Sequence, residues 1–215
     1  MFNLNLNLQL TIKIKQLKFI TMKKFLSLLT LIALLNLNYA TAQKKFNVNG
    51  VEIPRTLEFK GKTMSLNGVG QRSKFFTDLY VQALYLTKYS QDAVQILNSE
   101  TEMAIVLHIT SGLISSKKLS KALEKGMLKS VGEKGILTFS KELKELEYLL
   151  TTEETKTGDV FELTFNPQDE SLWITKNAAY KGQIKGLEFK KAFYGIWLSE
   201  NPVDPGLKDD LLGKS

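Results

Sequence analysis

The chain has 215 residues, 43% of them hydrophobic and 24% charged, with a formal net charge of +7, no cysteine and a single histidine, His108. Without cysteine it can form no disulfide, no cysteine-ligated zinc site and no iron–sulfur cluster, and one histidine cannot build a multi-histidine metal site. The counts predict one globular domain without a cofactor, and they disfavour hydrolases and transition-metal enzymes.

The first 42 residues have the features of an export signal. Met22 is followed by Lys23 and Lys24, then by a mostly apolar run at 25–37, and an Ala-Thr-Ala cleavage site ends at Ala42. A membrane anchor is the alternative, but a bilayer span takes roughly 20 apolar residues and this run is shorter. We predict three segments: an upstream extension before the true start at 1–21, a signal peptide at 22–42 and a mature domain at 43–215.

The predicted presequence carries most of the excess positive charge. Residues 1–42 contain five of the 29 basic residues and none of the 22 acidic ones, which leaves 24 basic and 22 acidic residues in the mature domain, a net charge of +2. A nucleic-acid partner therefore loses its main support. We expect a nearly neutral protein, periplasmic or secreted, with no membrane span in its mature part.

Strand patterns open the mature domain. Three short runs are expected to be strands, with Gly61 and Lys62 in a hairpin turn between the last two: 51–53, 57–60 and 63–66. The longer run 75–87 alternates with period two. Its odd positions predict a core face, and its even positions predict a second face that contacts something amphipathic.

The rest of the chain mixes helices and strands. Helical patterns occur at 91–98, from Ser115 or Ser116 onward, at 140–150, at 187–198 and after Pro205. Strand patterns occur at 103–109, 160–165, 172–175 and 179–184. Short strands around a central helical block predict an α+β fold, in which helices cover one face of an antiparallel sheet.

Two features that could carry chemistry are better explained structurally. His108 lies in an apolar strand without an acidic partner at a readable spacing, which favours a buried structural histidine over a catalytic one. Gly68 and Gly70 resemble the start of a dinucleotide-binding motif, but a strand follows them where that motif needs a helix. We predict that these glycines form a bend between strands.

Arg72 and Tyr80 form a more informative pair. Arg72 follows the glycines, and Tyr80 lies on the amphipathic face of the next strand. A guanidinium and a phenol hydroxyl are donors that suit a carboxylate, so both could bind the head of a long-chain acid in a cleft lined by Phe76 and Leu84. From the residues alone, the favoured interpretation is that Arg72 is a surface arginine and Tyr80 an ordinary sheet tyrosine.

Three segments carry a family resemblance. They are LNGVGQR at 66–72 with the strand that ends in ALYL at 83–86, LKSVG at 128–132, and IWLSENPVDPGLK at 196–208. In this order they resemble the chalcone isomerase superfamily over nearly the whole mature domain. The resemblance implies an open-faced β-sandwich, with a large antiparallel sheet, a helical layer on one face and a ligand cleft between the two.

The resemblance also suggests roles for individual residues. Plant chalcone isomerases surround their cleft with an arginine, which falls on Arg72. Their threonines, tyrosine and asparagine fall at or near four positions with other residues here: Tyr80, Ser116, Leu123 and Ile196. Relatives that bind fatty acids are understood to hold the carboxylate with an arginine and a tyrosine, which is the pair that this sequence retains.

The sequence therefore predicts an exported, non-catalytic domain that binds a fatty acid or similar amphipathic carboxylate. Arg72 and Tyr80 would hold the head group, and Phe76 and Leu84 would line the wall. Two alternatives stay open. One is an isomerase or lyase for a small phenolic or enone substrate, with Arg72 and Tyr80 as its catalytic residues, and the other is a structural or interaction protein of the cell envelope.

Overall fold

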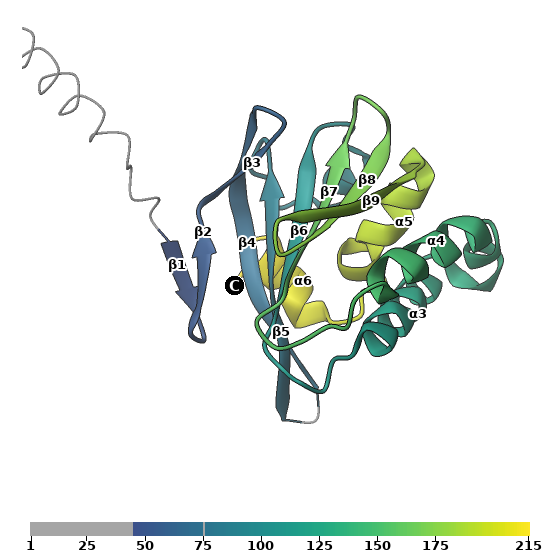
Figure 1. The fold of residues 1–215 in the computed structure, drawn as a ribbon. Coiled ribbons are helices and arrows are strands. Elements are labelled where there is room, and N and C mark those ends of the chain that lie inside the picture. The colour runs from purple at the N-terminus through teal and green to yellow at the C-terminus, as the bar shows by residue number, and fades with distance from the viewer. Residues whose placement is uncertain (1–44, 75) are drawn as a thin grey trace, which may run out of the picture. The chain divides into compact units, whose positions relative to one another are not determined.

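The computed structural model describes residues 45–74 and 76–215, so the predicted upstream extension and signal peptide lie outside the described residues. The described strands form a two-stranded hairpin and a seven-stranded sheet ordered β3-β4-β5-β6-β7-β8-β9, with antiparallel neighbours throughout (Figure 1). The strands are β1 (Lys45–Val48), β2 (Val51–Pro54), β3 (Thr56–Phe59), β4 (Lys62–Lys74), β5 (Thr77–Leu86), β6 (Met103–Ile109), β7 (Val160–Asn166), β8 (Ser171–Lys176) and β9 (Ala179–Lys185). The predicted α+β class and antiparallel sheet are confirmed.

The helices pack on one face of this sheet and build the larger core. They are α2 (Ala93–Asn98), α3 (Ser116–Leu137), α4 (Ser140–Thr151), α5 (Leu187–Leu198) and α6 (Pro205–Leu211). Leu107 and Leu163 of the sheet are buried in the same core as Met127 of α3 and Phe193 of α5. None of the helices in the described part is long and apolar enough to cross a bilayer.

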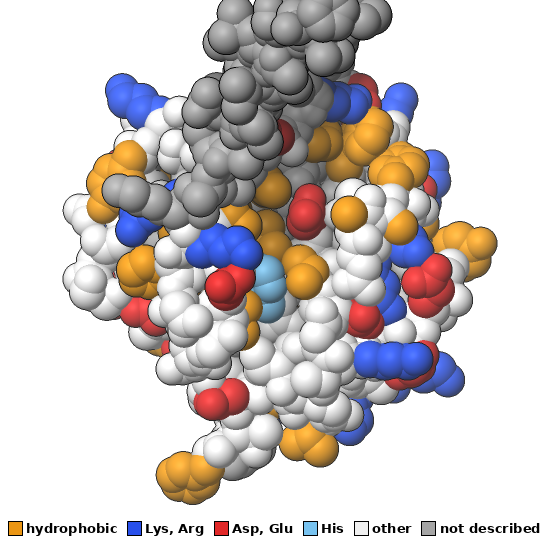
Figure 2. All heavy atoms as spheres, turned by 60° about the vertical axis from the view of Figure 1, so that its left-hand side comes forward, with side chains coloured by type: hydrophobic (Ala, Val, Ile, Leu, Met, Phe, Trp, Pro, Cys, Tyr) orange, Lys and Arg blue, Asp and Glu red, His pale blue; other side chains and the backbone are white. Residues whose placement is uncertain are grey.

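The opposite face of the sheet carries a smaller core beneath the β1–β2 hairpin. Ile53 of the hairpin is buried there with Val81, Ala83 and Tyr85 of β5, and the Tyr85 hydroxyl donates to the Pro54 carbonyl oxygen at 2.8 Å. Figure 2 looks onto this side of the molecule, where hydrophobic side chains surround a hollow. Strand alternation thus separates two cores, as the period-two pattern of β5 predicts.

β4 runs unbroken through Gly68 and Gly70, so the predicted bend between strands is wrong. A Cβ atom on Gly68 would lie too close to the Asp210 carbonyl oxygen, at 2.2 Å, and one on Gly70 would lie 2.5 Å from Asp210 Oδ2. The glycines therefore let α6 lie directly on the strand. In the described residues, the pairing of β4 with β5 shifts register between Leu66 and Gly68, and a second shift lies between Arg72 and Ser73.

β5 begins later than its hydrophobic pattern predicts. The chain turns between β4 and β5, where Phe76 has φ 62° and a fully exposed side chain, and β5 starts at Thr77. A bulky residue in the left-handed region is an outlier, and turns are among the places where it occurs. Phe76 therefore belongs to the hairpin tip, although its hydrophobicity fits the strand pattern.

Most other element boundaries agree with the sequence prediction to within a few residues. α5 occupies the predicted 187–198, and Ser115 caps α3 by accepting from the Lys118 backbone N–H. At α2 the capping residue is Asp92, which accepts from the Gln95 backbone N–H at 3.0 Å. Side-chain caps of this kind mark helix starts in a sequence and explain the agreement.

The contact between β4 and α6 predicts a large effect of a single methyl group. Gly68→Ala should lower the free energy of unfolding by about 1–3 kcal/mol, because α6 must move to accommodate the new Cβ. Urea unfolding measures this. Gly112→Ala is the control, since its Cβ would meet Thr157 Oγ1 at an ordinary 3.7 Å. A Gly68→Ala protein as stable as the Gly112→Ala protein would contradict the role given to this contact.

Candidate functional site

A cavity of about 300 Å³ lies between the helix-bearing face of the sheet and α3. Its walls come from β4, β5, β6, α3, α5 and the segment that precedes α6. Apolar side chains make up most of them, including Leu79, Leu107, Leu119, Leu123, Ile196 and Val203. The size and the apolar lining are those of a small-molecule site.

The cavity exists because α3 is held by its neighbouring helices. α3 packs mainly against α4 and α5. At the contact with α5, a Cβ atom on Gly126 would lie 2.6 Å from Ile196 Cγ2, so only glycine allows this approach. Side chains from α3 and α5 then surround a space over β5 and β6 that no side chain fills.

Arg72 and Tyr80 both line the cavity, and we call the part of the lining that they form its polar end. They lie directly opposite each other on β4 and β5, with both side chains among the cavity-lining residues. Residues paired this way have Cβ atoms roughly 5 Å apart, so one small group can contact both. The Arg72 Nη1 donates to Asp204 Oδ2 at 2.5 Å and to the Ser73 carbonyl oxygen at 3.2 Å.

The Tyr80 hydroxyl is oriented by Trp197 of α5. The indole N–H of Trp197 donates to the Tyr80 oxygen at 3.3 Å, which leaves the tyrosine O–H to act as a donor. Burial raises the pKa of Tyr80, although the hydrogen bond from Trp197 and the charge of Arg72 act in the opposite direction. Tyr80 is therefore a neutral donor at physiological pH, and it faces the same space as a permanent cation.

Lysine side chains add positive charge around the cavity. Lys74, Lys125 and Lys129 are exposed and belong to its lining, and Lys129 Nζ also donates to the Pro202 carbonyl oxygen at 2.6 Å. Asp204 is the acidic side chain that the structure pairs with Arg72 here. The surroundings of the polar end are thus net positive, which favours an anionic group.

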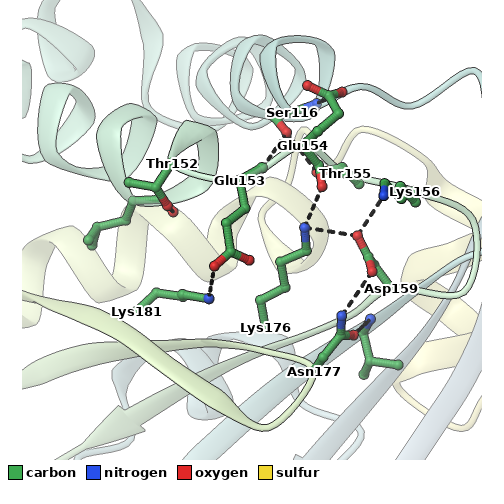
Figure 3. Close-up of polar contacts among 12 residues, drawn as sticks. Ser116, Thr152, Glu153, Glu154, Thr155, Lys156, Asp159, Lys176, Asn177 and Lys181 are labelled. Carbon is green, nitrogen blue, oxygen red and sulfur yellow. Dashed lines mark hydrogen bonds and ion pairs between the residues drawn. The ribbon is translucent and has the colours of Figure 1, made fainter.

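A polar network fixes the start of α3 to the sheet (Figure 3). Ser116 Oγ donates to the Glu153 carbonyl oxygen at 2.8 Å, and the Ser116 backbone N–H donates to Glu154 Oε1 at 3.3 Å. Lys176 of β8 donates to the Glu154 carbonyl oxygen at 2.6 Å and pairs with Asp159 at 2.9 Å. Because Glu153 and Glu154 follow α4, one network ties both α3 and α4 to the sheet.

Asp159 is the carboxylate at the centre of this network. Its Oδ1 accepts from Asn177 Nδ2 and its Oδ2 from the Lys156 backbone N–H, both at 2.9 Å. Burial acts to raise the pKa of Asp159, but the hydrogen bonds from Asn177, Lys176 and Lys156 outweigh it and lower the pKa. The ionised form therefore stabilises the fold.

The structure brings together two of the four predicted site residues. Arg72 and Tyr80 both line the cavity, whereas Phe76 points to solvent at the hairpin tip and Leu84 is fully buried in the core. Phe76 and Leu84 therefore do not form the expected wall. Strand alternation places Tyr80 and Leu84 on the same face of β5, but Leu84 lies within the core and Phe76 lies at the hairpin tip.

Several site residues were not expected from the sequence. Trp197 and Asp204 belong to the motif at 196–208, but nothing in the motif shows that they contact Tyr80 and Arg72. The Asp-Pro pair at 204–205 is a recognisable helix start, so the sequence does indicate that the Asp204 carboxylate caps a helix and is held in place.

His108 lies on the opposite face of the sheet, where burial lowers its pKa and keeps it neutral.

Comparison with known proteins places the fold. The model of the chalcone isomerase-like family matches residues 45–213. The chain belongs to this family. A crystal structure of a fatty-acid-binding protein from Arabidopsis thaliana is similar, with a TM-score of 0.65 and 16% sequence identity, over 79% of this chain and 96% of that one. At this identity the likeness shows a shared fold. No curated protein matches the sequence.

The positions that matched the plant enzymes' polar residues can now be placed. Tyr80, Leu123 and Ile196 line the cavity, but Ser116 does not, because its hydroxyl contacts Glu153 and Thr155 in the network below α3. Two of the three positions that reach the cavity are therefore apolar in this member of the family. The polar groups that remain gather at the end formed by Arg72 and Tyr80.

The network at the start of α3 predicts a pH-dependent contribution to stability. A carboxyl whose pKa is lower in the folded than in the unfolded chain stabilises above its unfolded pKa, and this is lost as the pH falls through the folded pKa. Asp159→Asn should therefore lower the free energy of unfolding by about 3 kcal/mol at pH 7. The deficit should shrink as the pH falls below about 4.

Urea unfolding of both proteins at pH 7 and pH 3 measures this difference. Glu153→Gln is the control, because the Glu153 side chain is largely exposed and its pair with Lys181 lies at the edge of the network. A deficit for Asp159→Asn that is the same at both pH values would show that the carboxylate charge is unimportant.

Proposed function

We propose that this protein binds a fatty acid or a similar amphipathic carboxylate in the cavity beneath α3. The observation that carries the proposal is the position of Arg72 and Tyr80, directly opposite each other on adjacent strands in the lining of an otherwise mainly apolar space. A carboxylate there accepts from the guanidinium and from the Tyr80 hydroxyl. The hydrocarbon chain lies against the leucines and Ile196.

The apolar wall supplies affinity and the polar end supplies orientation. Burying a hydrocarbon chain contributes about 0.8 kcal/mol per CH₂ group. A buried carboxylate without partners is costly, so the Arg72 charge and the neutral Tyr80 donor make that end of the cavity the favourable place for it. The fatty-acid-binding protein that shares this fold supports a ligand of the same class.

Binding without catalysis is the better supported form of this function. Leu123 and Ile196 are apolar where plant chalcone isomerases are polar, so a phenolic substrate would find few of its expected partners. The alternative is an isomerase or lyase in which Arg72 stabilises a developing oxyanion and Tyr80 acts as general acid. The hydrogen bond from Trp197 to Tyr80 favours this enzymatic alternative, because it occupies the Tyr80 oxygen and leaves the phenol proton for transfer to a substrate.

We also propose that the protein is exported. The support is the sequence at 22–42, with its basic start, apolar run and Ala-Thr-Ala ending. Cleavage after Ala42 leaves Gln43 as the first residue, two positions before the family match begins. An intact mass that starts at Gln43 in protein recovered from a cell envelope or medium is the expected result, and a mature protein that retains residues 22–42 would contradict it.

The binding proposal predicts that Arg72 controls ligand retention. Native mass spectrometry of the purified protein should show bound acyl chains, or uptake of added dodecanoate. Arg72→Ala should weaken dodecanoate binding about 10- to 100-fold, which is the effect of losing a charge-assisted hydrogen bond. Arg55→Ala is the matched control, because it removes the same charge from an exposed position near Phe46.

The same samples separate the competing functions. Wild-type protein that holds no acyl chain and takes up no dodecanoate would overturn the binding proposal. Cyclisation of a chalcone by the wild type, lost in Arg72→Ala and kept in Arg55→Ala, would identify the enzyme instead. Absence of both activities would leave the structural or interaction role in the cell envelope as the remaining explanation.

A further inference from the structure

The charge of Arg72 already has a partner within the protein. Its Nη1 lies 2.5 Å from Asp204 Oδ2, and the two side chains are only 21% and 24% exposed. In a site this sheltered the pairing is screened by solvent less than an ordinary surface ion pair. A ligand carboxylate at Arg72 therefore meets a guanidinium that is already neutralised by a carboxylate of the protein.

The two oxygens of Asp204 have separate tasks. Oδ1 accepts from the backbone N–H groups of Gly206 and Leu207, at 3.1 and 3.2 Å, and so caps α6. Oδ2 is the atom that pairs with Arg72. The cap and the ion pair can thus be changed independently, because asparagine and serine are also good helix caps but carry no charge.

The other charges around Arg72 do not cancel Asp204. Lys74, Lys125 and Lys129 line the cavity, but they are exposed. Asp204 also affects Tyr80: burial raises the pKa of this tyrosine and the Asp204 charge raises it further, against the effects of Trp197 and Arg72. Arg72, Tyr80 and Asp204 therefore form one electrostatic unit at the polar end of the cavity.

We propose that Asp204 is an internal competitor for Arg72 that sets the selectivity of the cavity between anionic and uncharged head groups. On binding, the ligand carboxylate takes the place of Asp204 Oδ2 on the guanidinium, while Oδ1 keeps its cap on α6. Asp204 thereby weakens the binding of carboxylates and leaves uncharged head groups unaffected. The inference rests on the proposed function, since it concerns the same cavity and the same ligand class.

The test compares one charged and one uncharged ligand of equal chain length. Dissociation constants for dodecanoate and dodecanol are measured with wild-type protein and with Asp204→Asn. Dodecanoate should bind Asp204→Asn about tenfold more tightly than wild type, because a competing like charge is removed. Dodecanol should bind both proteins equally within about twofold. The acid-to-alcohol ratio of affinities therefore measures the competition.

Two further variants control for folding and for general charge effects. Asp204→Ser keeps a capping oxygen and removes the charge, so it should repeat the result of Asp204→Asn. Asp209→Asn makes the same change of charge on an exposed residue of α6, and it should leave both affinities unchanged. Thermal unfolding of each variant establishes that α6 is still in place.

The outcomes distinguish this inference from the proposed function. If wild type binds dodecanoate and both Asp204 variants bind it no better, the competition is refuted while the binding function stands. An equal gain in Asp209→Asn would refute it too, since the effect would then come from net charge. If no variant binds either ligand, the proposed function fails and the inference fails with it.

Discussion

The ion pair between Arg72 and Asp204 joins the sheet to the C-terminal helix at the polar end of the cavity. It requires α6 to lie directly against β4, which is possible because Gly68 and Gly70 have no side chain to hold it away. The position of Arg72 in the cavity lining therefore depends on how closely α6 approaches β4 at Gly68 and Gly70. The packing of α6 and the arrangement of the polar end therefore depend on the same close contact.

The opposite wall depends on a different set of contacts. Ser116 and Lys176 fix the lower end of α3, and Gly126 sets how closely α3 approaches α5. The cavity is thus enclosed between two rigid attachments, one at the start of α3 and one at the α6 contact. Trp197, which lies on α5 between them, orients the Tyr80 hydroxyl. A site on rigid elements keeps its donors in place before any ligand arrives.

Much of this fold could be predicted from the sequence, because local signals determine it. The helix at 187–198 and the start of a helix at Ser115 or Ser116 depend on local signals, and both were predicted correctly. Gly68, Phe76 and Leu84 were misassigned because contacts distant in the chain, or a backbone turn, decide their place. For the site, the family resemblance predicts Arg72 and Tyr80, whereas the residues alone favour a surface arginine and an ordinary sheet tyrosine. The walls from α3 and α5 and the partner Asp204 could not be predicted, since they require knowledge of how the layers pack.

The proposed binding geometry can be examined in a crystal structure of the protein with bound dodecanoate. We expect carboxylate oxygens within about 3 Å of the Arg72 guanidinium and the Tyr80 hydroxyl, with the hydrocarbon chain between α3 and the sheet against Leu107 and Leu123. Dodecanoate located on the opposite face beside the β1–β2 hairpin, or with its carboxylate directed away from Arg72, would contradict it.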